Sequence, residues 1–464
     1  MLKLNFPKNF SIKTVLFLSL NLILFLNLSC TTDPVLEPDL KLGLEDVSCT
    51  EAWLQLTTNN IQLPATINLL KNNSVTQTFS LSTKDSLLYI DSLLPNQSYK
   101  FKVVANTTNN PQPTTNEVLA QTMDTTSHNF TFETFTFGEA GAGGSTLYDV
   151  AIIDENNIWA VGEIYTADTY TYDSLGNWID PYNALHWNGN NWELVRIYYN
   201  YNGSNIWSPI RTILAFSSND IWFSAGIHWN GVDFITKPMN INFPYQINKM
   251  WGPSSSDFYV VGSSGNIAHY GGLSLGWKQI ESGVDTDLKD IDGTSDGKEI
   301  WTCGWSNSTG RVSLLKINNN AVESLWDSQT NTTLNIYRGT LLNSLYTNGS
   351  SEFVLVGGQV LRHSLYNKSN VKLEWIKTYN GSKVLELGNY AYRIKGSNKN
   401  NIIAAGDAAM IWHFNGATWY KYSELYNLED RLYGLAVTEN TTVAVGKRYS
   451  AGTLGGALLI VGRR

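Results

Sequence analysis

The side chains best suited to chemistry in this sequence are two aspartates, Asp149 and Asp290, each in a short apolar segment. Comparable segments carry cations, namely Arg211, Lys249, Lys289 and Arg393. Two carboxylates that face each other across a pocket could hydrolyse a glycosidic bond. The same residues are also typical of a polar, water-filled channel. We therefore predict no catalytic residue, and we keep a carbohydrate-active enzyme, a glycosidase or a lyase, as the alternative.

Other catalytic signatures are missing from the sequence. It has no nucleophile motif for acyl transfer, no glycine-rich phosphate loop and no paired zinc-ligand motif. Residues 290–297 have the spacing of a calcium loop, but aspartate and glycine are also expected where a strand ends in a turn. We predict the strand and turn, with no metal and no cofactor.

The histidines occupy similar places in the sequence. Five of the six histidines lie in the third apolar segment of a repeat: His186, His228, His269, His363 and His413. Neighbouring sheets pack about 10 Å apart, whereas zinc needs each nitrogen within about 2 Å. The sequence therefore predicts a hydrogen bond repeated inside each sheet and no shared metal.

Aromatic side chains gather in two polar connections. The first connection, residues 163–181, carries Tyr165, Tyr170, Tyr172 and Trp178, and the second, residues 198–207, carries Tyr199, Tyr201 and Trp207. Aromatic side chains on loops offer a large contact area at low entropic cost, which suits sugars and protein partners. We predict a ligand-binding rim made of both connections, with the alternative that the two merely pack on each other.

A recurring five-residue pattern indicates the elements that position these side chains. An apolar run ending in glycine occurs seven times, at Gly162, Gly226, Gly262, Gly304, Gly357, Gly406 and Gly446. About twelve residues earlier lies another apolar segment, marked by Val150, Ile213, Met250, Ile291, Leu345, Ile394 and Leu435. Asn-Gly turns and an aromatic residue follow several of the glycines. Four short strands per repeat predict a propeller blade.

The repeats resemble the kelch-like, BNR-type and photosystem-assembly-factor-like repeats of exported bacterial proteins. The shared pattern is a strand ending in Val-Gly, then a His-aromatic-Asn-Gly turn and a tryptophan, as in residues 411–419. The resemblance implies a seven-bladed β-propeller over residues 128–464. The seventh repeat lacks a fourth strand after residues 457–461, and the alternating segment 130–137 has no repeat of its own. We predict that residues 130–137 complete the seventh blade.

The first 29 residues have the features of an export signal. Lys3, Lys8 and Lys13 precede an apolar run that ends at Ser29, directly before Cys30. This segment resembles a bacterial lipoprotein signal, which implies cleavage before Cys30 and acylation of that cysteine. Acyl chains on Cys30 would anchor the protein to membrane lipid. Residues 30–39 are predicted to form a tether, and Cys49 and Cys303 to remain free and buried thiols.

Residues 40–124 predict a separate all-β domain. The pattern Leu-x-Pro-x-x-x-Tyr-x-x-x-Val is met by Leu93, Pro95, Tyr99 and Val103. It resembles the fibronectin type III family, an immunoglobulin-like sandwich. The resemblance implies that Tyr99 is the corner tyrosine, that Trp53 lies in the core, and that residues 117–122 form the last strand.

Composition limits the function further. The 464 residues carry a net charge of −8, and the signal segment holds three more lysines than acidic residues, so the processed chain is more acidic still. An acidic chain argues against nucleic acid as a partner. We expect a monomeric lipoprotein of the cell envelope, anchored to the outer membrane, that binds a glycan or an envelope protein.

Overall fold

The computed structural model describes residues 39–106, 112–139, 141–239, 246–318, 320–329, 341–347, 351–356, 359–364, 385–386, 388–450 and 453–464. The export signal and Cys30 lie outside these residues, as does all of the tether except Asp39, which begins the first strand. Among the described residues, no helix is long and apolar enough to cross a membrane. The chain divides into two compact units, Met1–Gly43 with Gln55–Ser86 and Lys100–Val118, and Leu44–Leu54 with Leu87–Tyr99 and Leu119–Arg464.

Residues 39–121 form two antiparallel sheets. One sheet has the order β1 (Asp39–Val47), β2 (Ala52–Asn59), β5 (Asp85–Ile90), and the other has the order β4 (Ser74–Leu81), β3 (Ala65–Lys71), β6 (Ser98–Asn106), β7 (Val118–Gln121). Strand β6 alternates buried and partly exposed residues, as expected for a strand with one face on a core. Trp53 is buried, and the Tyr99 hydroxyl accepts a hydrogen bond from the Leu94 N–H at 2.9 Å. Both side chains are placed as the sequence predicts.

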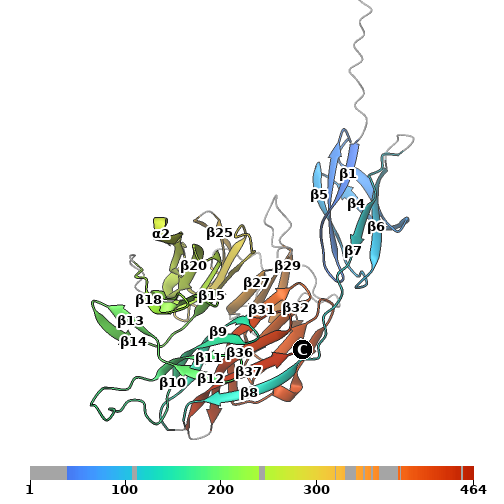
Figure 1. Cartoon of the computed structure of the whole chain (residues 1–464). Helices are drawn as coiled ribbons and strands as arrows, with labels where there is room; N and C mark the ends of the chain where they lie inside the picture. Colours follow the sequence, from blue (N-terminus) through green and yellow to red (C-terminus); the bar gives the residue numbers. More distant parts are fainter. Residues whose placement is uncertain are drawn as a thin grey trace, which may run out of the picture. The chain divides into compact units, whose positions relative to one another are not determined.

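The rest of the described chain contains seven four-stranded antiparallel sheets, the blades of a propeller (Figure 1). Blade one is β9 (Thr146–Asp154), β10 (Asn157–Ile164), β11 (Tyr182–Trp187) and β12 (Trp192–Val195). Blade two is β15 (Ile213–Ser217), β16 (Asp220–Phe223), β17 (Ile227–Trp229) and β18 (Phe234–Thr236). Blade three is β19 (Ile247–Ser254), β20 (Asp257–Gly262), β21 (Ile267–Tyr270) and β22 (Trp277–Ile280). Blade four is β23 (Asp287–Gly293), β24 (Ile300–Trp305), β25 (Val312–Asn318) and β26 (Ala321–Asp327), and blade five is β27 (Leu342–Thr347), β28 (Ser351–Val356), β29 (Gln359–Ser364) and β30 (Leu385–Glu386). Blade six is β31 (Ala391–Asn398), β32 (Asn401–Gly406), β33 (Ile411–Phe414) and β34 (Trp419–Lys421).

Blade seven combines the two ends of the propeller region. Its order is β35 (Asp430–Val437), β36 (Thr441–Ser450), β37 (Thr453–Arg463) and β8 (Thr131–Phe137). Strand β8 pairs with β37 from Ala457 opposite Phe137 to Arg463 opposite Thr131. The prediction that residues 130–137 complete the seventh blade is confirmed.

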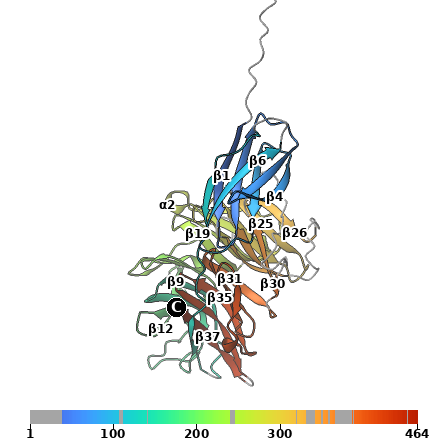
Figure 2. The ribbon, with the colours of Figure 1, turned by 90° about the vertical axis from the view of Figure 1, so that its right-hand side faces the viewer.

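The first strands of the blades form a closed ring. Each first strand contacts the first strand of the next blade, and β35 of blade seven contacts β9 of blade one (Figures 1 and 2). Buried apolar side chains fill the space between adjacent blades, as where Leu147 and Ile158 of blade one meet Val443 and Leu459 of blade seven. Burial between the sheets stabilises the ring, because a single blade cannot cover its own faces.

The remaining elements are short. A hairpin of β13 (Tyr198–Tyr201) and β14 (Ser204–Trp207) joins blades one and two, and short helical turns occur at η1 (Ser224–Gly226), η2 (Ser263–Gly265), α2 (Gly272–Leu275) and η4 (Ser423–Leu425). Cys49 and Cys303 are buried, and neither forms a disulfide with another described residue, as predicted.

Candidate binding site at the centre of the propeller

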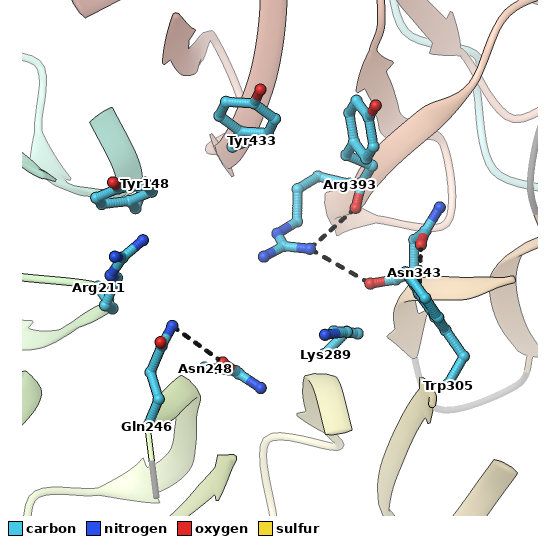
Figure 3. A pocket seen from close by; sticks show the side chains of 10 residues that line it. Tyr148, Arg211, Gln246, Asn248, Lys289, Trp305, Asn343, Arg393 and Tyr433 are labelled. Atoms are coloured by element: carbon cyan, nitrogen blue, oxygen red, sulfur yellow. Dashed lines mark hydrogen bonds between the residues drawn. The ribbon is translucent and has the colours of Figure 1, made fainter. Parts of the chain in front are cut away.

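A cavity of about 280 Å³ lies where the first strands of the seven blades meet (Figure 3). Its lining includes one residue from each blade: Tyr148, Arg211, Asn248, Lys289, Asn343, Tyr392 and Tyr433. Gln246, Trp305 and Arg393 complete the lining. Each of the seven precedes by two positions the buried apolar residue that marks its first strand. The repeat therefore places one side chain per blade around the same space.

A β-bulge directs six of these seven side chains into the cavity. In every blade except blade two, the pairing of the first and second strands skips one residue near the start of the first strand. The six skipped residues are Tyr148, Asn248, Lys289, Asn343, Tyr392 and Tyr433. A bulge re-aims a side chain away from the ladder, and bulges are frequent beside functional sites. Of these six residues, only Lys289 is predicted from the sequence as a candidate.

In blades one, four, six and seven, the repeated glycine of the second strand allows this bulge to form. Gly162 pairs with Leu147, directly beside the bulge at Tyr148. A Cβ atom at Gly162 would overlap the carbonyl oxygen of Thr146, and one at Gly304 would overlap the carbonyl oxygen of Asp287. Only glycine allows the bulged strand to approach so closely. The repeated glycine is thus needed for the bulge that lines the cavity.

Three cations point into the cavity from different blades (Figure 3). The guanidinium of Arg211 lies over the ring of Tyr148, with its carbon 4.0 Å from the ring centroid. Lys289 is 3.1 Å from a carboxylate oxygen of Asp287. Arg393 donates hydrogen bonds to the carbonyl oxygens of Tyr392 at 3.0 Å and Asn343 at 3.3 Å. No carboxylate is among the described residues that line the cavity.

The two aspartates singled out in the sequence lie one residue beyond the bulges and are buried. Both oxygens of Asp149 accept hydrogen bonds from Lys249, at 2.6 and 2.7 Å, and one also accepts from the Thr212 hydroxyl at 2.8 Å. Asp290 contacts Lys395 at 3.1 Å and the Ser344 hydroxyl. Asp149 and Asp290 therefore do not face each other across the cavity, as a glycosidase would require.

Burial and neighbouring charges shift the pKa values in this network in different directions. Burial alone would raise the pKa of Asp290, but the charges of Lys395, Arg393 and Lys249 hold it below its usual value. Burial raises the pKa of Asp292 to about 6, although Lys395 opposes the shift at 3.4 Å. The pKa of Lys395 is raised, because its two aspartate partners outweigh the effect of burial. Asp290 and Lys395 are therefore charged at neutral pH, and Asp292 ionises only near pH 6.

Asp292 should make the stability of the protein depend on pH. Its folded-state pKa exceeds the unfolded value, so its contribution to the free energy of unfolding is fully present below about pH 4 and is lost as the pH rises through about 6. We therefore compare the free energy of unfolding of Asp292→Asn with that of the natural chain, measured by urea unfolding at pH 4.5 and pH 7. The difference should shift in favour of Asp292→Asn at pH 7. Asp296→Asn is the control, because Asp296 lies in an exposed turn with a lowered pKa, so its difference in stability from the natural chain should stay nearly constant between pH 4.5 and pH 7. An unchanged difference between Asp292→Asn and the natural chain at the two pH values would contradict this assignment.

The aspartates of residues 290–297 make contacts that differ from those of a calcium loop. Residues Asp287–Gly293 form β23, as the strand-and-turn prediction expects. Asp290 and Asp292 both contact Lys395, whereas Asp296 accepts hydrogen bonds from the Thr294 hydroxyl at 2.7 Å and the Lys298 N–H at 3.1 Å. Among the described residues, no group of three potential ligands could hold a metal ion.

The third-strand histidines form the predicted hydrogen bonds inside the blades. In each pair, histidine Nε2 lies against the first residue of the second strand: His186 with Asn157 at 3.1 Å, His228 with Asp220 at 2.8 Å, His269 with Asp257 at 2.7 Å, and His413 with Asn401 at 3.1 Å. Three of the rings also stack on an aromatic residue of the second strand, as His186 does on Trp159. The side chain of His363 lies outside the described residues.

The aromatic residues of the 163–181 connection form one cluster. Tyr165 lies 5.4 Å from Tyr170, Tyr170 lies 5.9 Å from Trp178, and Tyr172 lies 5.2 Å from Trp178, measured between ring centroids. Tyr170, Tyr172 and Trp178 are exposed, whereas Tyr165 is half-buried. We call these four residues the aromatic cluster.

The aromatic residues of the second connection behave differently. Tyr201 is exposed at the end of β13, Tyr199 packs on the core between blades one and two, and Trp207 is half-buried. Among the described residues, no ring contact joins them to the aromatic cluster. The structure therefore brings together four of the seven residues predicted for the rim.

A hydrogen-bond chain links the aromatic cluster to the cavity. The Tyr148 hydroxyl donates to one oxygen of Glu163, and the Tyr165 hydroxyl donates to the other at 2.7 Å. The Tyr170 hydroxyl reaches that of Tyr165 at 3.5 Å. Burial, together with these hydrogen bonds, raises the pKa of Tyr165 and of Tyr148 well above the usual range, so both phenols stay protonated donors. Cavity and cluster thus lie on the same face of the propeller.

The fold places the chain among the β-propellers. No family model and no curated protein matches it. Among solved structures, YCF48 bound to a D1 peptide aligns over 73% of this chain and 99% of that chain, with a TM-score of 0.50 and 14% identity. The WD40 propeller domain of Doa1 aligns over 73% and 98%, with a TM-score of 0.47 and 10% identity, and YCF48 from Cyanidioschyzon merolae over 71% and 98%, with 0.44 and 12%. At these identities the similarity concerns the fold alone.

Proposed function

We propose that the propeller is a binding module that holds a partner on its cavity face without carrying out chemistry. The observation that carries this proposal is the exposed aromatic cluster, which hydrogen bonds through Glu163 fix beside the central cavity. Three exposed rings that are already packed on one another lose little side-chain entropy on binding, so their area can contribute to affinity. Asp149 and Asp290, the best candidates for catalysis, are both occupied in buried ion pairs.

The finer parts of the proposal come from the sequence. Cys30 carries acyl chains and anchors the protein to the outer membrane, with a fibronectin type III-like domain as spacer. The buried Trp53 and the corner hydrogen bond of Tyr99 support this domain assignment. The partner is then a glycan or a protein of the envelope, because an anchored propeller would meet molecules of these two classes. One of the similar structures, YCF48 with a D1 peptide, is a propeller bound to a polypeptide.

Replacing two exposed rings of the aromatic cluster tests the function. We expect the double variant Tyr172→Ala, Trp178→Ala to lose at least about tenfold in affinity for its partner, since exposed aromatic anchors are frequent hot spots. The partner is sought on an array of envelope glycans and by capture from envelope extract. Binding is then measured with the purified partner, the natural chain and the variant.

Leu273→Ala is the matched control for this experiment. Leu273 is 87% exposed and follows the third strand of blade three, on the opposite face of the propeller. Its replacement should leave binding unchanged. Equal affinity of the double variant and the natural chain would rule out the aromatic cluster as the binding surface. Turnover of a polysaccharide that is lost in Asp149→Asn would favour the enzyme instead.

A further inference from the structure

We propose that the central cavity is a subsite for an acidic side chain of a protein partner, a carboxylate held between Arg211, Lys289 and Arg393. This inference rests on the proposed binding function and names the chemistry of the partner. The three cations come from blades two, four and six, so they surround the cavity (Figure 3). The chain as a whole is acidic, which makes this local concentration of positive charge unusual.

The free hydrogen-bond donors of the cavity are mostly cationic. Arg393 uses one nitrogen for backbone carbonyls, while its Nε is buried and has no hydrogen-bond partner among the described residues. Arg211 forms no ion pair with any described carboxylate and rests on the Tyr148 ring. Donors of this kind form their strongest hydrogen bonds with a carboxylate or another oxyanion.

Most neutral polar groups of the lining are already paired. The Asn248 amide donates to the carbonyl oxygen of Leu288, and the Asn343 amide donates to that of Ala391, both at 2.9 Å. Trp305 donates to Asn343 at 3.2 Å. The hydroxyls of two lining tyrosines are also paired: Tyr148 with Glu163, and Tyr433 with Tyr449.

Because most of these neutral groups are paired, the cavity suits an acidic side chain of a protein better than a sugar. A sugar ring brings several hydroxyls, and each needs a free partner when it is buried. The paired amides and phenols offer few such partners. The side chain of glutamate or aspartate needs only cationic donors around its carboxylate and apolar contact along its methylenes. At about 280 Å³, at the small end of the range for ligand pockets, the cavity fits one such group.

The carboxylates next to the cavity do not neutralise all three cations that line it, because Asp149 and Asp290 are paired elsewhere. Asp149 and Asp290 are held by Lys249 and Lys395 one residue beyond the bulges. Lys289 is the one lining cation with a described carboxylate within 4 Å, namely Asp287. The cavity therefore keeps at least two cations without a paired acid. It therefore attracts an anionic group of the partner, while the aromatic cluster contacts the partner's surface around that group.

Direct titration of the full chain tests the inference. The probes are hexaglutamate, hexaglutamine and the acidic sugar trigalacturonate, measured by calorimetry at low and moderate salt. We expect hexaglutamate to bind at least about tenfold more tightly than the other two and to weaken as salt increases. Arg211→Gln and Lys289→Gln should each reduce hexaglutamate affinity about tenfold, while the exposed Lys278→Gln should not.

Melting temperatures identify variants that fail to fold, and either Arg211→Gln or Lys289→Gln is sufficient to decide. Unchanged hexaglutamate affinity in a folded cation variant would overturn the inference, as would equal binding of hexaglutamine. Tighter binding of trigalacturonate would assign the cavity to a sugar instead and also overturn it. Loss of partner binding in the Tyr172→Ala, Trp178→Ala variant, together with no binding of hexaglutamate, would sink this inference and leave the proposed function standing.

Discussion

Replacing residues 130–137 with a glycine–serine segment of equal length is expected to prevent the propeller from folding as a monomer. The replacement removes β8, which pairs with seven residues of β37. It also removes four phenylalanines, of which Phe130 and Phe132 contact Tyr422 of blade six, and Phe135 and Phe137 contact Trp192 of blade one. Strand β8 therefore packs blade seven against blade six and blade one.

The expected loss is large on the scale of protein stability. Truncating a buried phenylalanine costs about 3–5 kcal/mol, so four partly buried ones contribute roughly 5 kcal/mol or more, against a total of about 5–15 kcal/mol for a folded domain. The replacement also exposes β37 as a long apolar edge, which invites pairing between chains. Light scattering should show oligomers, and the melting temperature should fall. Replacing the exposed turn 173–176 in the same way is the control. A monomer with an unchanged melting temperature would show that β8 is dispensable.

The closure could be predicted because the relevant signals are local. A chain that repeats a four-strand pattern needs the same number of strands in each repeat, and residues 130–137 alternate strictly enough to identify the missing one. The repeated glycine also located the second strands. Its physical reason, the overlap that a Cβ at Gly162 would cause with Thr146, appears only when the first strand is in place.

The site was harder to predict, because β-bulges decide which side chains enter the cavity. In a regular strand, alternate residues share a face, so one extra residue reverses the faces that follow it. Asp149 was therefore considered as a channel residue, whereas the bulged residue before it, Tyr148, is the one that lines the cavity. A signal was present: the position two residues before each apolar marker is polar or aromatic in all seven repeats.

The aromatic rim shows a different limit of sequence reasoning. The alternation of strand direction predicts that both connections emerge on one face of the propeller, but it does not fix their distance around the ring. Residues 163–181 fold back on themselves, as the pairing of Tyr172 with Trp178 shows, and form a cluster of their own. The hairpin β13–β14 instead packs Tyr199 against the core between blades one and two. Neither arrangement follows from composition or spacing.

Lys395→Met is expected to destabilise the protein strongly, and more at high pH than at low pH. The ammonium group of Lys395 contacts both Asp290 and Asp292, and its removal leaves two buried carboxylates without their nearest cation. Removing one partner of a buried ion pair costs about 3–5 kcal/mol, because the remaining charge is neither solvated nor paired. The loss should appear as a lower midpoint in urea unfolding at pH 8.

The pH dependence follows from the direction of the pKa shifts. In the natural chain the folded-state pKa of Asp290 is lowered, so its carboxylate stabilises the fold above the unfolded pKa of about 4, and this contribution is lost as the pH falls through the folded pKa. Without Lys395 the pKa values of Asp290 and Asp292 must both rise, since the opposing charge is gone. The folded variant then takes up protons as the pH falls, so its deficit should shrink between pH 8 and pH 4.5. Adding Asp290→Asn to Lys395→Met should recover part of the stability at pH 8, and Lys298→Met, which breaks the exposed pair with Asp296, should change little at either pH. A deficit that is equal at pH 8 and pH 4.5 would show that Lys395 contributes packing rather than charge.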